Sequence, residues 1–190
     1  MAPRGEDVKG RLLRAAAELI SERGWSAVST RTLADRAGVG PGLVHYHFPS
    51  LQALLTQAAI QAITAIVEEA VHLLGPTTTP HQGLALILRE LDRYPGDDPA
   101  SHLVTETYLA ATRDPHLRQA VTGVLDLMRL HLTDWLTHAG VPQPRQTATV
   151  LAATLDGVLL HRALTPDLTS TEIEPVLRRL FTHHTPGAHP

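Results

Sequence analysis

The stretch from Ser29 to Phe48 has the pattern of a helix-turn-helix motif, and it constrains the fold more than any other part of the chain. Ser29 is a suitable N-cap, because its hydroxyl can accept a hydrogen bond from a free amide of the first helical turn. Gly38 can end that helix, since glycine adopts the left-handed C′ conformation at little cost. Pro41 suits the first position of a second helix, where no amide hydrogen is needed. The sequence therefore predicts two short helices around a tight turn, the second ending near His47.

The two predicted helices differ in the side chains that they can bury. In the first, Leu33, Ala34 and Ala37 lie three or four positions apart and share one face. In the second, only Val44 and Phe48 can pack inward. The others face outward or lie at the edge: Gly42, Leu43, His45, Tyr46 and His47. Such a helix contributes little to a core, but it can present side chains to base edges in a DNA major groove.

Arg31 strengthens the DNA-binding hypothesis, because it lies in the first turn of the first predicted helix. From there a guanidinium can reach a phosphate or a guanine. The alternative is a plain helical hairpin with a solvated face, and the spacing alone does not decide between the two.

Composition predicts an all-α protein of about nine helices. At 190 residues, one or two domains are expected. Hydrophobic residues make up 43% and aromatic residues only 4%, so the core must consist of Leu, Ala, Val and Ile. Abundant Leu and Ala without alternating β-branched runs favours helices. The absence of cysteine excludes disulfides and thiolate metal sites and suits a reducing cytosol.

The charge distribution fits a basic DNA-binding head on an acidic body. The whole chain carries −3, but residues 1–55 hold seven basic and five acidic side chains, a net +2, so the remainder must carry −5. The N-terminal residues are charged and show no apolar segment typical of a signal peptide, and we find no run of 18 apolar residues that would span a membrane. These features predict a cytoplasmic protein.

Seven further helices are predicted from apolar residues at helical spacing. They cover residues 7–23, 50–74, 81–93, 100–112, 115–138, 145–164 and 170–183. Trp25 is expected to pack where the first three helices meet. The apolar faces of the last two helices can either complete the core of one chain or pair with a second copy.

The twelve histidines do not predict a metal site. Metal ligands on a helix need a spacing of three or four residues together with converging partners. His45 and His47 diverge on a helix, and His131 and His138 are two turns apart. No phosphate-binding loop or nucleophile elbow is present, so we expect neither a cofactor nor enzymatic activity. A helical metal-binding protein stays as the less favoured alternative.

Residues 8–55 resemble the DNA-binding domain of the tetracycline-repressor-like (TetR) transcriptional regulators. The matching segments are Ser21–Trp25, Ser29–Ala34, Ala37–Val39, Val44–Phe48 and Leu54–Leu55. The resemblance implies a helix-turn-helix DNA-binding domain at residues 1–49 and a ligand-binding and dimerisation domain at residues 50–190. The helix that begins after Ser50 would connect the two.

The resemblance also implies DNA contacts residue by residue. Three residues would begin the support helix and contact phosphate or a base: Ser29, Thr30 and Arg31. The next three would let the recognition helix approach DNA closely: Gly40, Pro41 and Gly42. Four more would touch bases and phosphates: Leu43, His45, Tyr46 and His47.

The chain departs from the family pattern at several of these positions. The family usually has Ser at Gly40, a small polar residue or Thr at Leu43, and Tyr at His45. It also has Lys at Leu51, where a phosphate contact is expected, and an acid at Gln52. Leu43 can instead contact a thymine methyl group. These changes affect the operator sequence more than the class of binding partner.

In the body, the resemblance implies an effector pocket and a dimer interface. The candidate pocket residues are His102, Thr105, Tyr108, Met128, His131 and Trp135. Without a cluster of Lys or Arg, these residues favour an apolar, aromatic effector. The family pairs its last two helices with their mates in a four-helix bundle, and the matching residues are Val150, Leu151, Val158, Ile173, Val176, Leu177, Leu180 and Phe181.

Taken together, the sequence predicts a homodimeric, ligand-responsive repressor that binds a palindromic operator and is released by a small, largely apolar effector. A palindromic site requires two recognition helices about one DNA turn apart, which a dimer supplies. The alternative is a TetR-like dimer that has lost DNA binding and acts through protein partners, as the missing Lys at Leu51 would allow.

Overall fold

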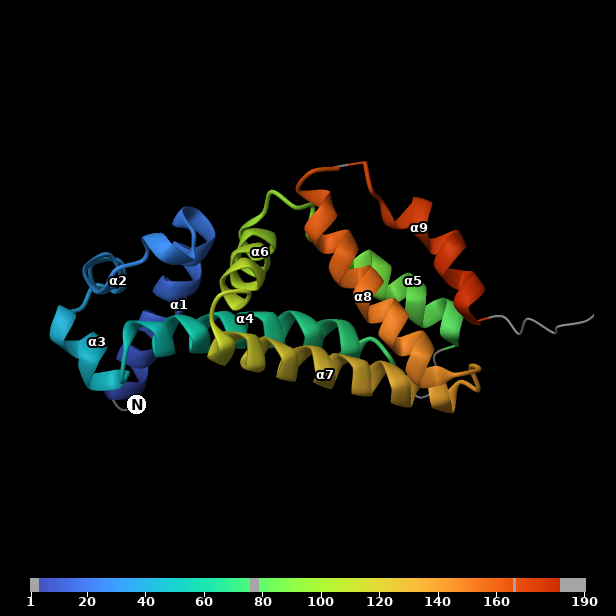
Figure 1. Cartoon of the computed structure of the whole chain (residues 1–190), viewed down its shortest axis with the longest axis horizontal. Coiled ribbons are helices and arrows are strands. Elements are labelled where there is room, and N and C mark those ends of the chain that lie inside the picture. The colour runs from blue at the N-terminus through green and yellow to red at the C-terminus, as the bar shows by residue number, and fades with distance from the viewer. Residues whose placement is uncertain (1–3, 76–78, 166, 182–190) are drawn as a thin grey trace, which may run out of the picture. The chain divides into compact units, whose positions relative to one another are not determined.

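The computed structural model describes residues 4–75, 79–165 and 167–181, and all regular structure in these residues is helical (Figure 1). The all-α prediction is therefore confirmed. The α-helices are α1 (Arg4–Arg23), α2 (Thr30–Ala37), α3 (Pro41–His47), α4 (Leu51–His72), α5 (Pro80–Leu91), α6 (Pro99–Ala111), α7 (Pro115–His138), α8 (Pro144–Arg162) and α9 (Ser170–Leu177). Two 3₁₀ turns complete the described part, η1 (Trp25–Ala27) and η2 (Arg178–Phe181).

The predicted helix boundaries agree with the structure to within about three residues, apart from the C-terminal helix and one short turn. Helix α1 begins at Arg4 rather than at residue 7. Helix α9 ends at Leu177 rather than at residue 183, and the chain continues as η2. Pro175 within α9 has no amide hydrogen for the helical ladder, which weakens the helix near its end. Residues 182 and 183 lie outside the described residues. The short turn η1 was not predicted, because three residues are too few to show periodicity.

The chain forms two compact units, and each draws on two separate segments. The first comprises the described residues through Ile66 together with Asp97–Val124. The second comprises Val67–Gly96 together with the described residues from Leu125 onward. This division differs from the predicted boundary between residues 49 and 50. The reason is that α6 packs against α1, so a segment late in the chain joins the N-terminal helices.

The core of the first unit holds the helix-turn-helix in place. Helix α1 packs against α2, and α2 packs against α3. Fully buried side chains come from α1, α2, α3 and α4: Leu12, Ile20, Leu33, Val44, Leu54 and Leu55. Trp25 is buried, as predicted, with 8% of its surface exposed. Removing each large aliphatic side chain from water contributes about 1.5–3 kcal/mol.

The second unit is built around aliphatic residues of α5, α7 and α8. The most deeply buried are Leu84, Leu88, Leu132, Leu136 and Leu151. Leu177 and Phe181 join this core from α9 and η2. The core is therefore completed by the C-terminal helical segment.

A buried arginine ties three segments of the second unit together. Arg162, only 3% exposed, donates to the carbonyls of Leu168 (2.9 Å) and Tyr94 (3.3 Å). It also forms an ion pair of 2.5 Å with Asp92, which in turn accepts a hydrogen bond from Ser170. The charge of this buried arginine is thus paired and its donors are used, as a buried charge requires.

Helix α4 is long and apolar enough, by length and composition, to cross a membrane. This property was not predicted from the sequence, because polar residues such as Gln57 and Gln61 interrupt the apolar run. Core helices of soluble proteins share this property. Buried residues recur along α4 at helical spacing, including Leu54, Ala58, Ile63 and Val67, while Gln57 and Gln61 are exposed. This amphipathic pattern fits a helix packed within the protein.

Candidate nucleic-acid interface

The support helix α2 is fixed at both ends by local hydrogen bonds. The Ser29 hydroxyl accepts from the Thr32 amide (3.2 Å), and the Thr32 hydroxyl accepts from the Ser29 amide (3.0 Å). This reciprocal capping box satisfies two amides that the helix leaves free. At the other end Gly38 has φ +65°, in the left-handed region, and the Val39 amide donates to the Ala34 carbonyl. The predicted N-cap and C-cap are both confirmed.

Two arginines of this region make contacts within the protein. Arg11 on α1 donates to the Ala37 carbonyl at 3.2 Å and so holds the C-terminal end of α2. Arg36 on α2 forms ion pairs with Glu18 (3.0 Å) and Glu22 (2.6 Å) on α1. These contacts fix the turn between the helices. No sequence signal identifies them, because each joins residues far apart in the chain.

The Arg36 cluster also shifts proton affinities. The hydrogen bond from Arg36, with its positive charge, lowers the pKa of the Glu22 carboxyl. The hydrogen bonds to Glu22 and Glu18 raise the pKa of the Arg36 guanidinium. Both groups therefore stay ionised at neutral pH, and part of the basic charge of the head is neutralised internally.

The recognition helix α3 buries one face and exposes the other, as predicted. Val44 is fully buried, and Phe48, just beyond the helix, is 4% exposed. Tyr46 is 80% exposed and Leu43 is 38% exposed. His45 is also exposed, and the half-buried His47 ring lies edge-on to the Tyr46 ring at 5.1 Å. An exposed tyrosine on a short helix is available to a partner such as DNA.

The remaining predicted DNA contacts lie around the ends of α2 and α3. Ser29 and Arg31 are exposed, and Thr30 is half-buried. Gly40, Pro41 and Gly42 are all exposed as well. A β-carbon added at Gly40 or Gly42 would meet nothing within 4 Å, and Gly40 has an ordinary φ of −71°. These two glycines are thus not required by the packing of the chain itself.

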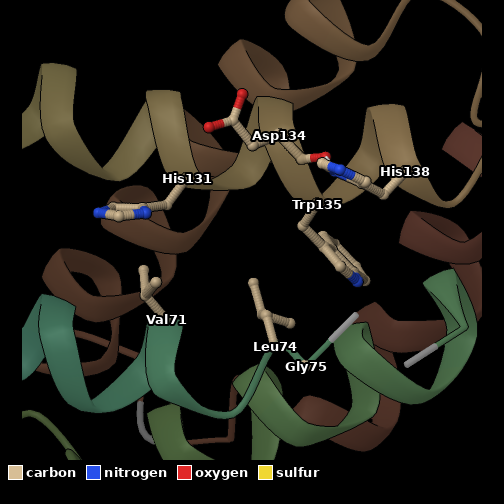
Figure 2. Close-up of a pocket in the computed structure, with 7 residues that line it drawn as sticks. All are labelled: Val71, Leu74, Gly75, His131, Asp134, Trp135 and His138. Carbon is tan, nitrogen blue, oxygen red and sulfur yellow. Dashed lines mark hydrogen bonds between the residues drawn. The ribbon is translucent and has the colours of Figure 1, made fainter. Parts of the chain in front are cut away.

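The six predicted effector residues fall in different units. His102, Thr105 and Tyr108 belong to the first unit, and Met128, His131 and Trp135 to the second. Met128 packs against the core of the second unit. His131 and Trp135 line a pocket of about 230 Å³ (Figure 2). The other residues that line it are Val71, Leu74, Gly75, Asp134 and His138.

Figure 2 shows His131 on the side of Val71 and the Trp135 ring beside Leu74, while the Asp134 carboxylate points away from these two aliphatic residues. His138 Nδ1 lies 2.7 Å from the Asp134 carbonyl oxygen. The pocket is thus lined by aliphatic groups, an indole and two imidazoles, together with Asp134. Sequence reasoning missed Val71 and Leu74, because nothing in the sequence places the end of α4 beside α7.

The predicted dimer residues divide into buried and exposed sets. Four are already buried within the single chain, and their contact with a second copy stays a prediction: Leu151, Val158, Leu177 and Phe181. The periodicity identified an apolar face but not what covers it. Val150 and Val176 are 49% and 58% exposed, and Ile173 and Leu180 are half-buried. These four are accessible to a partner.

Within residues 4–75, 79–165 and 167–181, no three His, Asp or Glu side chains are grouped so that they could hold a metal ion. His131 and His138 both line the pocket, but they do so without a third ligand suitably placed. The described residues give the metal-binding alternative no support.

Comparison with known proteins agrees with this architecture. The family model of bacterial regulatory proteins of the tetR family matches residues 12–58, and that of the tetracyclin repressor-like C-terminal domain matches residues 78–183. The HTH-type transcriptional regulator BetI of Rhizobium meliloti (strain 1021) is 25% identical over 157 residues, which are 80% of this chain and 76% of BetI.

Solved structures show the same relationship. The TetR family member SCO1917 of Streptomyces coelicolor A3 is 28% identical, with a TM-score of 0.76 over 95% of this chain and 100% of that one. The multidrug binding protein EbrR complexed with imidazole is also 28% identical, with a TM-score of 0.74 over 94% of this chain and 97% of EbrR. EbrR has a second similar structure, complexed with proflavin.

A capped helix-turn-helix with an exposed recognition helix, joined to a helical C-terminal region, defines a DNA-binding transcriptional regulator. The chain belongs to the TetR family of these regulators. Its relatives are transcriptional regulators, not enzymes, and this protein is likewise a transcriptional regulator.

Proposed function

We propose that the protein is a homodimeric repressor that binds a palindromic operator and is released by a small, largely apolar effector. The observation that carries this proposal is the exposed face of α3, where Tyr46 leaves 80% of its surface uncovered on a helix anchored by buried Val44. Leu43, His45, Tyr46 and His47 contact bases and phosphates, and Arg31 contacts a phosphate or a guanine. Since its partner is chromosomal DNA, the repressor acts in the cytoplasm.

A dimer is supported by apolar residues that the single chain leaves uncovered on its last two helices. On α8, Val150 and Ala153 are exposed, and Gly157 is half-buried on the same helical face. On α9, Val176 is exposed beside Pro175. Small and apolar side chains at helical spacing permit close packing of helices from two copies. The two-fold axis of such a pair would match a palindromic site.

The effector site in this proposal is the pocket of the second unit. Its volume of about 230 Å³ lies below the usual range of roughly 300–1,000 Å³, which favours a ligand of one or a few rings. The relative EbrR has structures in complex with imidazole and with proflavin. Both are aromatic compounds, which an indole-lined pocket could also accommodate. In a Trp25→Phe variant, proflavin should quench the emission of Trp135. Measurable binding with unchanged emission would place the ligand elsewhere.

The experiment that tests DNA binding is selection of genomic fragments by the purified protein at fixed salt, since phosphate contacts make affinity strongly salt-dependent. An Arg31→Ala, Tyr46→Ala double variant serves as the control. Enrichment of a palindrome by the wild type alone would establish the operator. Equal recovery by both proteins at low salt would overturn the proposal and favour a function through protein partners.

A further inference from the structure

The turn η1 joins α1 to α2 and so sets the direction in which the helix-turn-helix leaves the first helix. Just before it, Gly24 has φ +82°, in the left-handed region that favours glycine. Within it, Trp25 is 8% exposed. A turn of three residues has few hydrogen bonds of its own, so its geometry depends on what contacts it from outside.

Two later helices of the same unit contact this turn through Trp25. The Glu106 carboxylate on α6 accepts a hydrogen bond from the Trp25 backbone amide at 2.9 Å. The indole Nε1 of Trp25 donates to the Gln52 side-chain carbonyl on α4 at 3.1 Å. Trp25 is therefore held at two points: α6 binds its backbone amide, and α4 binds its side chain.

The fit between Glu106 and the turn is close. A β-carbon at position 24 would lie 3.0 Å from the Glu106 carboxylate oxygen Oε2, so Gly24 supplies space as well as its unusual φ. Hydrogen bonds to a charged acceptor are about twice as strong as those between neutral groups. Without Glu106, the amide of a buried residue would have to find another acceptor.

We infer that Glu106 is a positioning residue for DNA binding. By holding the Trp25 amide it fixes η1, and thereby the orientation of α2 and α3 relative to α1. Glu106 lies in the segment matched as the C-terminal domain of the family, whereas Trp25 lies in the segment matched as the DNA-binding domain. This hydrogen bond therefore connects the segments matched by the two family models directly, independently of the covalent connection through α4. This inference rests on the proposed DNA binding.

The test compares two variants that remove the same charge. Glu106→Ala removes the acceptor oxygen, while Glu106→Gln keeps one. Loss of an acid by itself favours binding to DNA, so the exposed Glu68 on α4 supplies a charge-matched control as Glu68→Ala. Affinity for the selected operator is measured at fixed salt. We expect Glu106→Gln to stay within about twofold of Glu68→Ala and Glu106→Ala to bind about five- to tenfold more weakly, as loss of one hydrogen bond implies.

A second readout follows the bond itself. The chain has two tryptophans, so labelling with ¹⁵N-tryptophan gives two backbone and two indole signals. The Trp25 amide should exchange with solvent faster in Glu106→Ala than in Glu106→Gln or Glu68→Ala. If Glu106→Ala does not melt cooperatively, Glu106→Asp is used in its place. The aspartate side chain is one methylene shorter, so its carboxylate should not reach the Trp25 amide, and the same results are expected.

The outcomes separate this inference from the proposed function. Wild-type binding with equal operator affinity for the alanine and glutamine variants would overturn the role of Glu106 and leave DNA binding intact. A wild type that selects no operator would overturn both. Weaker binding by Glu106→Ala together with faster exchange of the Trp25 amide would establish the positioning role. A reduced affinity without faster exchange would contradict it.

Discussion

The indole of Trp135 lies directly against the backbone of Gly83, where a β-carbon would come within 2.2 Å of the ring atom Cζ2. The same β-carbon would lie 2.9 Å from Leu74 Cδ2. The ring is also edge-on to Phe181, at 6.2 Å between centroids. The wall of the pocket is therefore set by a glycine on α5 that allows α7 to approach it.

Gly83→Ala should destabilise the protein by about 1–3 kcal/mol, because the extra methyl group overpacks the contact between α5 and α7. Chemical denaturation measures this change. Gly123→Ala on α7 is the matched control, since a β-carbon there meets nothing within 4 Å. Removing a helical glycine should stabilise the protein by about 0.5–1 kcal/mol. An equal effect of both substitutions would contradict the contact.

Gly42→Ala should separate folding stability from DNA binding. Apart from its chain neighbours and the backbone of its own helix, the added methyl group would meet no atom within 4 Å. Stability should therefore stay unchanged or rise by up to about 1 kcal/mol through helix propensity. Operator affinity should fall at least several-fold if DNA approaches the backbone closely at this position. Thermal denaturation and an operator-binding titration measure the two effects, and undiminished affinity would show that the space at Gly42 is not used by DNA.

Leu51→Lys should strengthen operator binding by restoring the basic residue that the family carries at this position. In a plot of log affinity against log salt concentration, one new phosphate contact should make the slope steeper by about one. Gln61→Lys adds the same charge at an exposed position of α4, ten residues further along the helix, and serves as the control. Salt titrations of both variants measure the slopes. Equal slopes would indicate only a general charge effect.

Val150→Glu combined with Val176→Glu should convert the proposed dimer into a monomer. Both side chains are about half exposed in the single chain, so folding should tolerate the change. Burying two carboxylates in a helix bundle would oppose pairing. Sedimentation measures the mass, and circular dichroism checks the fold. A wild type that sediments as a monomer would contradict the interface.

The ion pairs of Arg36 should contribute stability that depends on pH. The pKa of Glu22 is lowered from its ordinary 4.5, mainly by the Arg36 hydrogen bond. A carboxyl whose pKa is lowered on folding stabilises the folded state above its unfolded pKa, and this contribution is lost as pH falls through the folded pKa. Glu22→Gln should therefore lower Tm slightly near pH 7, with a difference that shrinks below about pH 4. A difference that does not depend on pH would exclude the ionic origin.

Local signals were sufficient to predict the helix-turn-helix. Ser29 bonds to Thr32, Gly38 ends α2, and Pro41 begins α3, and each feature depends on residues within a few positions along the chain. The alternation of buried Val44 with exposed Tyr46 follows from the helical period alone. The sequence by itself therefore determined these helices, their caps and the face that α3 exposes.

Only the tertiary structure decided which apolar faces are covered and which distant residues meet. Val150 and Leu151 are adjacent and both apolar, yet the first is exposed and the second fully buried. Glu106 and Trp25 are 81 positions apart, and Arg162 reaches Asp92 across 70 positions. Helical periodicity specifies that a face must be buried, but not against what. That choice depends on how helices pack in three dimensions, which short-range sequence patterns do not encode.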